Sequence, residues 1–277
     1  MRVAALVAIA LLGACSTVQR EAPANSFVMA PPAAPTPAGP PQRLPGYLQE
    51  GELDILQVLA PAPVEGSVRY EADRKVFLAT RAFEGSPRWR MADEDAKLGS
   101  ADLLKHFACA LDAQLDPASV PATLRLLQRS VRDAGVAMNT AKNHYKRLRP
   151  YRIDTGPLCR PVEDLGETYD YPSGHAMAGW TWALTLADVA PDRIAPLLAR
   201  GRAIGESRVV CGMHNPSAVD ASRTAATAVV LALQAKSEWQ ADAEAARKEL
   251  AQVRGKAPRP DPQACAVESA LIAQPIG

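Results

Sequence analysis

Three short stretches of the chain combine cations or histidines in spacings that suit anion binding and proton transfer. The first is KNHYKRLRP, in which Lys142 and Arg149 are seven residues apart. Seven residues span about two helical turns, so both side chains would project from one face of a helix. Arg149 could bind a multiply charged anion through two hydrogen bonds, with Lys142 as a point charge. The alternative is an ordinary solvated basic face.

The second stretch is YPSGH, which precedes an apolar segment. Ser173 is a suitable helix N-cap, and Gly174 would let a ligand approach the backbone closely. The free N–H groups of a helix N-terminus bind phosphate or sulfate. His175 would then lie beside a bound anion and could protonate a leaving oxygen. The alternative is a capped helix with an incidental histidine.

The third stretch is ESRVVCGMHNPSAVD, which contains a cation and a histidine beside a helix start. Arg208 would lie near the end of one helix, which Gly212 interrupts. Asn215 and Pro216 would begin the next helix as its N-cap and first residue. His214 would therefore be held in a tight corner between two helices. A buried structural histidine is the alternative interpretation.

The elements that must position these residues are predicted to be helices, because apolar residues recur with a helical period from Ser67 to Arg254. No strand-like alternation or internal repeat occurs there. The expected helices cover about 68–83, a segment starting at Ser86-Pro87, 101–115, 117 or 121 to 149, 173–190, 191–212 and 216–250, with a loop over 151–171. The predicted class is all-α, a single-domain helical bundle whose core includes GWTWALTLADVA and TAATAVVLALQA.

Taken together, the three stretches resemble the signature of the type 2 phosphatidic acid phosphatase superfamily: Lys-x6-Arg-Pro, then Pro-Ser-Gly-His, then Ser-Arg-x5-His. Wider segments such as FACALD, DAGVAMNTAKNHYKRLRPY and GESRVVCGMH are similar to the bacterial class A non-specific acid phosphatases. The resemblance runs from about Tyr47 to the last long helix. The matching residues are Lys142, Arg149 and Pro150; Pro172, Ser173, Gly174 and His175; and Ser207, Arg208 and His214.

The resemblance implies a role for each of these side chains in phosphomonoester hydrolysis. His214 would be the nucleophile that forms a phosphohistidine, and His175 would protonate the departing alcohol and later activate water. The phosphoryl oxygens would be bound by Lys142, Arg149, Ser173, Gly174 and Arg208. The resemblance implies no metal and no other cofactor, small phosphomonoesters as substrates, and an acidic optimum if His175 must be protonated.

The chain departs from the family pattern at one position, because the third motif of the family ends in His-x3-Asp and Ala218 stands at that place. The absent carboxylate would orient the nucleophilic imidazole, and in serine proteases disabling the comparable Asp costs on the order of 10⁴ in turnover. Asp220 would point roughly 200° away from position 218 around the helix. Glu206, the Ser217 hydroxyl, a backbone carbonyl or a water could orient His214 instead.

This departure leaves more than one functional hypothesis. The first is an active acid phosphatase of low substrate specificity, and the second is a weakened or inactive relative that only binds phosphate. A lipid phosphatase is disfavoured because TAATAVVLALQA is too short to span a membrane and charges follow it. Haloperoxidase activity is disfavoured because those enzymes are typically larger.

The N-terminal segment indicates export. Residues 1–14 form a secretory signal pattern, and LLGAC resembles the bacterial lipobox, which implies cleavage before Cys15 and lipid attachment to it. Ordinary signal cleavage is the alternative. Residues 15–46 are rich in Pro and Ala and suit an extended tether. The expected organisation is completed by a phosphatase domain over 47–255 and a C-terminal tail over 256–277, in a periplasmic or outer-membrane-anchored lipoprotein.

Charge and cysteine content limit the remaining possibilities. Lys and Arg number 31 against 30 Asp and Glu, a balance that argues against a nucleic-acid-binding protein. The membrane would be contacted only through the lipid anchor, and the oligomeric state is not predicted. Four cysteines remain after Cys15, and their spacing does not suit zinc. Two disulfides are expected in any of three pairings, with buried free thiols as the alternative: Cys109, Cys159, Cys211 and Cys265.

Overall fold

The protein folds into packed helices, seen in a computed structural model that describes residues 44–165 and 167–276. Within those ranges there are helices and short 3₁₀ turns but no strand, so the predicted all-α class is confirmed. The helices are α1 (Ile55–Val58), α2 (Val68–Thr80), α3 (Pro87–Glu94), α4 (Ser100–His106), α5 (Ala108–Leu111), α6 (Pro121–Tyr145), α7 (Gly174–Val189), α8 (Ile194–Val210), α9 (Pro216–Gln234), α10 (Ser237–Arg254) and α11 (Pro262–Ile272).

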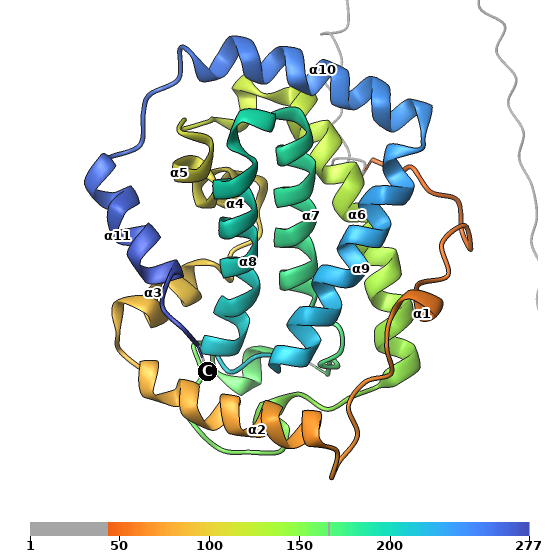
Figure 1. The fold of residues 1–277 in the computed structure, drawn as a ribbon, viewed down its shortest axis with the longest axis vertical. Coiled ribbons are helices and arrows are strands. Elements are labelled where there is room, and N and C mark those ends of the chain that lie inside the picture. The colour runs from red at the N-terminus through yellow and green to blue at the C-terminus, as the bar shows by residue number, and fades with distance from the viewer. Residues whose placement is uncertain (1–43, 166, 277) are drawn as a thin grey trace, which may run out of the picture. The chain divides into compact units, whose positions relative to one another are not determined.

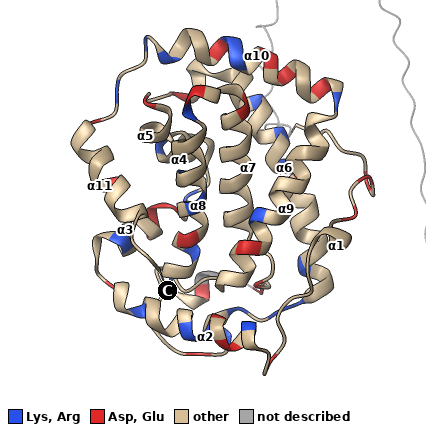
Figure 2. Cartoon of the chain, viewed as in Figure 1, with Lys and Arg blue, Asp and Glu red and all other residues tan. Residues whose placement is uncertain are grey.

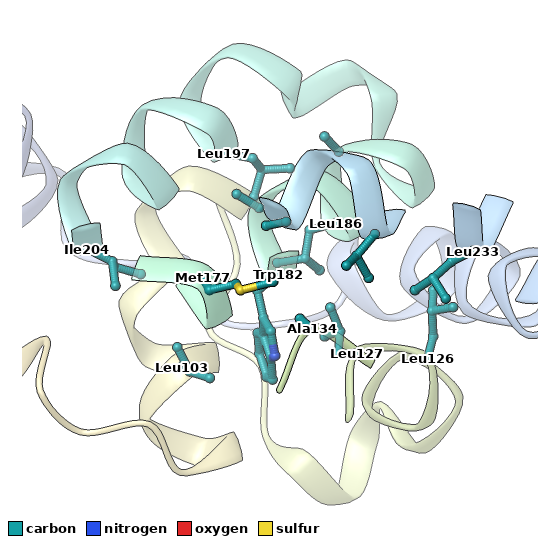
Figure 3. Packing of buried hydrophobic residues seen from close by; sticks show 14 of the residues in the cluster. Leu103, Leu126, Leu127, Ala134, Met177, Trp182, Leu186, Leu197, Ile204 and Leu233 are labelled. Carbon is teal, nitrogen blue, oxygen red and sulfur yellow. The ribbon is translucent and has the colours of Figure 1, made fainter. Parts of the chain in front are cut away.

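Helix α7 is the centre of the core, and it packs against α6, α8 and α9 (Figure 1). Asp188 is its one charged residue, so Figure 2 shows it tan along almost its whole length. Trp182 is fully enclosed and stacks with Phe107 at a centroid distance of 6.4 Å. Figure 3 shows Trp182 and Met177 among leucines of the surrounding helices. The predicted core segments on α7 and α9 therefore do line the core.

Helices α7 and α8 pack against each other with a glycine of α8 at their contact. A Cβ atom placed on Gly201 would lie 2.3 Å from the Cβ of Ala183, which is far below van der Waals contact. The absence of that atom lets the two backbones approach. This close approach brings the end of α8 near the start of α7, where two of the three motifs lie.

Three of the predicted helices differ from the structure, and the one expected over 101–115 is divided at Phe107 into α4 and α5, which ends at Leu111. The helix expected over 216–250 is two helices, α9 and α10, because the chain turns at Ala235 and Lys236. The turn lets α10 cross the end of the bundle drawn at the top of Figure 1, where Trp239 is buried and its indole N–H donates to Ser130 Oγ over 3.1 Å. Core burial therefore outweighs the helix propensity of the connecting residues.

The helix expected to reach Arg149 ends at Tyr145, because Lys146 adopts a left-handed conformation with φ of 49°. Arg149 is extended and precedes a 3₁₀ turn over Pro150–Arg152. The seven-residue spacing predicted that the two cations share one helix face, and this prediction is wrong. Lys142 lies in the last turn of α6, and Arg149 lies on the irregular segment after it.

The C-terminal segment and the disulfides complete the fold. Cys109 pairs with Cys265 and Cys159 with Cys211, which selects one of the three possible pairings. The first bond ties α11 to α5. None of the helices over 44–165 and 167–276 is long and apolar enough to cross a membrane. The predicted leader, Cys15 and residues 16–43 of the tether lie outside the described residues.

Candidate active site

The predicted site residues come from four segments that converge at the end of the bundle drawn at the bottom of Figure 1. These segments are the end of α6 with the turn after it, the start of α7, the end of α8 and the turn before α9. The α8–α9 turn is compact, because the backbone N–H groups of Met213 and His214 both donate to the carbonyl of Arg208. Gly212 makes this turn possible with φ of 72°, and a Cβ there would lie 2.6 Å from Arg81 Nη1.

His214 is buried and held through both ring nitrogens. Its Nδ1 lies 2.8 Å from the carbonyl oxygen of Asp170 and 3.0 Å from Asp170 Oδ1. A carbonyl oxygen can only accept, so Nδ1 carries the proton and Nε2 carries the lone pair. Arg149 Nη1 lies 3.0 Å from Nε2 and donates to it. The nitrogen with the lone pair therefore faces a cation, as a nucleophile directed at a bound anion would.

Asp170 contacts His214 but belongs to none of the three motifs. It is fully buried just before Tyr171 and Pro172. Besides His214, its carboxylate accepts from the backbone N–H of Asn215 over 3.1 Å and from Asn215 Nδ2 over 2.9 Å, and it lies 3.4 Å from Arg147 Nη1. Burial raises the pKa of Asp170 to about 6, against the opposing effects of Arg147 and Asn215.

Of the groups proposed to orient His214 in place of a carboxylate at position 218, the structure shows one in contact with the imidazole. Asp220 binds Arg69 and Arg223 at the surface, and Glu206 binds Arg202, so neither orients His214. The hydroxyl of Ser217 contacts Arg147 and Asp73. A backbone carbonyl does contact the imidazole, as one of the alternatives anticipated, and it belongs to Asp170.

Two of the three predicted cations contact backbone carbonyls around the histidine. Lys142 Nζ donates to the carbonyl of Tyr169, and Arg149 Nη1 donates to the carbonyl of Met213 over 3.0 Å. Burial and the charge of Arg149 lower the pKa of Lys142 to about 7, and burial also lowers the pKa of Arg149. Asp170 is the one carboxylate that counters both shifts. The cations therefore repel one another where solvent screens their charges poorly, and this repulsion favours the binding of an anion.

Arg208 lies at the end of α8 and is 4% exposed. Its Nε and Nη1 atoms are buried and have no hydrogen-bond partner among the described residues. Burial and the charge of Arg149 lower the pKa of Arg208 to about 10. A buried guanidinium without an acceptor is costly, so this side chain is placed for a ligand rather than for stability.

The start of α7 has the predicted cap. The Ser173 hydroxyl accepts from the N–H of Ala176 over 3.4 Å, and Gly174 is the first helical residue. His175 Nε2 lies 3.2 Å from the carbonyl of Ala96 and must donate to it, so Nδ1 is the nitrogen available for proton transfer. Burial and the charge of Arg208 lower the pKa of His175 to about 3.

A recess of about 310 Å³ adjoins His175 and Gly174. Its wall is almost entirely apolar, which suits the carbon skeleton of a ligand rather than its charge. The other residues that line it are Leu98, Val131, Ala134, Gly135, Met138, Met177 and Ala178. Across the described part of the chain, no group of three or more His, Cys, Asp or Glu side chains could hold a metal ion.

Comparison with known proteins shows the family to which the chain belongs. The family model of the PAP2 superfamily matches residues 128–240, which contain all three motifs. An acid phosphatase of Zymomonas mobilis is 40% identical over 217 residues, covering 78% of this chain and 82% of the relative. Non-specific acid phosphatases of Providencia stuartii and Salmonella typhimurium are 32% and 33% identical, covering 75% and 69% of this chain and 86% and 78% of the relatives.

The chain therefore belongs to the PAP2 superfamily, and within it groups with the bacterial acid phosphatases. The charges of Lys142, Arg149, Arg208 and His175 all act on the imidazole of His214, and Ser173 and Gly174 begin the helix that carries His175. Asp170 and Arg147 were missed because neither stands in a motif position that the family pattern marks. A signal was present all the same, since Asp170 is an acidic residue two positions before the Pro-Ser-Gly-His motif.

Proposed function

We propose that the protein is an acid phosphatase that hydrolyses phosphomonoesters through a covalent intermediate on His214, without a metal. The observation that carries the proposal is the unprotonated Nε2 of His214, which faces the half-buried Arg149 and lies among the charges of the buried Lys142 and Arg208. In the first step, Nε2 attacks phosphorus, the P–O bond to the alcohol breaks, and His175 gives its proton to the departing oxygen. In the second, His175 takes a proton from water, the oxygen attacks phosphorus, and the P–N bond breaks.

The cations supply the stabilisation that the transition state requires. Charge spreads over the three equatorial phosphoryl oxygens, where Lys142, Arg149 and Arg208 can donate to them together with the free N–H groups at the start of α7. Arg149 must turn its Nη1 donor from His214 Nε2 to a phosphoryl oxygen as the attack begins. The charge of a bound ester also offsets the cations that lower the pKa of His175, so its imidazolium form becomes accessible in the complex and an acidic optimum follows.

The leaving group lies beside His175 in this mechanism, next to the apolar recess. The recess has no charged or hydrogen-bonding lining apart from His175 and the backbone, which favours esters of varied apolar or aromatic alcohols over one specific alcohol. This is consistent with low substrate specificity. The export pattern and the lipobox-like LLGAC further support a protein held at a bacterial envelope membrane through Cys15.

The test is turnover of p-nitrophenyl phosphate at acidic pH in the presence of EDTA. Hydrolysis well above that of the His214→Ala variant is expected. Phosphate binding without turnover would instead support the weakened phosphate-binding relative that Ala218 suggested. Lipid attachment is tested separately: the wild-type protein should partition into the detergent phase, and the Cys15→Ser variant should not.

A further inference from the structure

We infer that Asp170 is the positioning residue of His214. The family motif places a carboxylate one helical turn after the histidine, and this chain supplies the carboxylate from the loop before α7 instead. The inference rests on the proposed function, because it concerns how His214 works as a nucleophile. The carboxylate that is absent at Ala218 is therefore supplied by Asp170 and is not lost.

The geometry around Nδ1 carries the inference. Oδ1 of Asp170 lies 3.0 Å from Nδ1, and both groups are shielded from solvent, with side-chain exposures of 0% for Asp170 and 1% for His214. When His214 becomes positively charged by bonding to phosphorus, this contact becomes a buried ion pair with a hydrogen bond. Such bonds between charged partners are about twice as strong as neutral ones. The contact is therefore stronger in the covalent intermediate than in the free enzyme, as catalysis requires.

A purely structural role would explain only part of what Asp170 contacts. Its bonds to Asn215 hold the start of α9, and its proximity to Arg147 balances charge. Asp73 provides a comparison within the same network. It is also buried, binds Arg147 Nη2 over 2.8 Å and accepts from the N–H of Ser217, which lies in the first turn of α9, two residues after the N-cap Asn215. Asp73 makes no contact with His214, so the two carboxylates differ in that one respect.

The structure also separates two tasks that one carboxylate usually performs. The backbone carbonyl of Asp170 accepts from Nδ1 over 2.8 Å whatever the side chain is, so it fixes the tautomer of His214. The carboxylate adds the negative charge, because the positively charged imidazole of the covalent intermediate lowers the pKa of Asp170 below the value of about 6 that burial gives it. Removing the charge alone should therefore cost less than the factor on the order of 10⁴ seen where the tautomer is also wrong. A hydrogen bond to a charged group corresponds to a loss of about 10- to 150-fold in rate.

The experiment compares Asp170→Asn with Asp73→Asn in the hydrolysis of p-nitrophenyl phosphate, alongside the inhibition constant of inorganic phosphate. Asp170→Asn is expected to lower kcat by about 10- to 150-fold while KM and phosphate inhibition stay near wild type, because the phosphate-binding cations are intact. Asp73→Asn is expected to lower the melting temperature but to retain the wild-type kcat. Adding Ala218→Asp to Asp170→Asn should recover part of the lost rate, since it returns a single carboxylate to the imidazole.

Three outcomes would overturn the inference. Wild-type kcat in Asp170→Asn would show that the carboxylate does not act through His214. Equal losses of kcat in both single variants would show that the loss arises from Arg147, which both carboxylates contact, and not from His214. A double variant no faster than Asp170→Asn would contradict relocation. Failure of the proposed function is distinguishable, because the wild-type protein itself would then be no faster than His214→Ala, and the inference would fall with it.

Discussion

Replacing Arg208 by Met should make the protein more stable and less active. The buried guanidinium has Nε and Nη1 without partners, and its pKa is lowered from 12.5 to about 10. That difference corresponds to a cost of about 3 kcal/mol for keeping the side chain charged. Since the cost is fully present at any pH below the lowered pKa, it does not change across an assay range of pH 5 to 8.

The magnitudes follow from that cost. A gain of 3 kcal/mol would raise the melting temperature by up to about 10 °C in a domain of this size, less what the lost packing costs. Removing one donor to the transition-state charge should lower kcat by about 10²–10³. Differential scanning calorimetry in phosphate-free buffer gives the first quantity and p-nitrophenyl phosphate hydrolysis gives the second. Added phosphate should also stabilise the wild-type protein more than the variant, because phosphate binds the folded state through this cation.

Arg200→Met is the matched control, because Arg200 lies on the same helix and is equally buried but has a partner. Its guanidinium binds Asp95 over 2.5 and 3.2 Å. Removing it leaves a buried carboxylate uncompensated, which should cost about 3–5 kcal/mol. The reasoning is refuted if Arg208→Met melts lower than wild type in the absence of phosphate, or if it keeps the wild-type kcat.

Three further predictions concern the surroundings of the site. Ala218→Asp in a chain that keeps Asp170 should lower the melting temperature without raising kcat, because it adds a second buried carboxylate; a large gain in kcat would show that His214 lacked an effective partner. The pKa of His175 is lowered to about 3, so the folded state binds fewer protons than the unfolded state and its stability should fall as pH falls from about 6.5 toward 3. The melting temperature of His175→Gln should depend less on pH across that range than that of the wild-type protein. An equal dependence on pH in both proteins would contradict the lowered pKa of His175. Replacing Cys159 and Cys211 by Ser opens a loop of 52 residues and should lower the free energy of unfolding by about 4 kcal/mol, measured by chemical denaturation. An unchanged denaturation midpoint would show that the disulfide does not constrain the unfolded chain.

The parts of the fold that the sequence predicts are those determined locally. Ser86 and Pro87 begin α3, and the Ser173 cap begins α7, because capping depends on a few adjacent residues. The break between α9 and α10 was missed, since it depends on the burial of Trp239 against a helix more than a hundred positions away. The end of α6 was missed because Lys146 is not a residue type that normally adopts a left-handed conformation.

The site divides in the same way. The three motifs identify its cations and histidines because each motif is a short run of sequence with its own chemistry. The contact between Asp170 and His214 joins residues 44 positions apart across a loop without regular structure. No periodicity relates such residues, so the side chain that bonds to Nδ1 could be identified only once the loop had been placed in space.

The central claim, covalent catalysis by His214, is tested most directly by trapping the intermediate. A phosphomonoester labelled with ³²P is mixed with the enzyme at acidic pH and quenched within one turnover. A phosphohistidine should survive alkali and be released by acid, and it should be absent from His214→Ala. Turnover by the wild-type protein without any such label, or equal labelling of His214→Ala, would contradict the account.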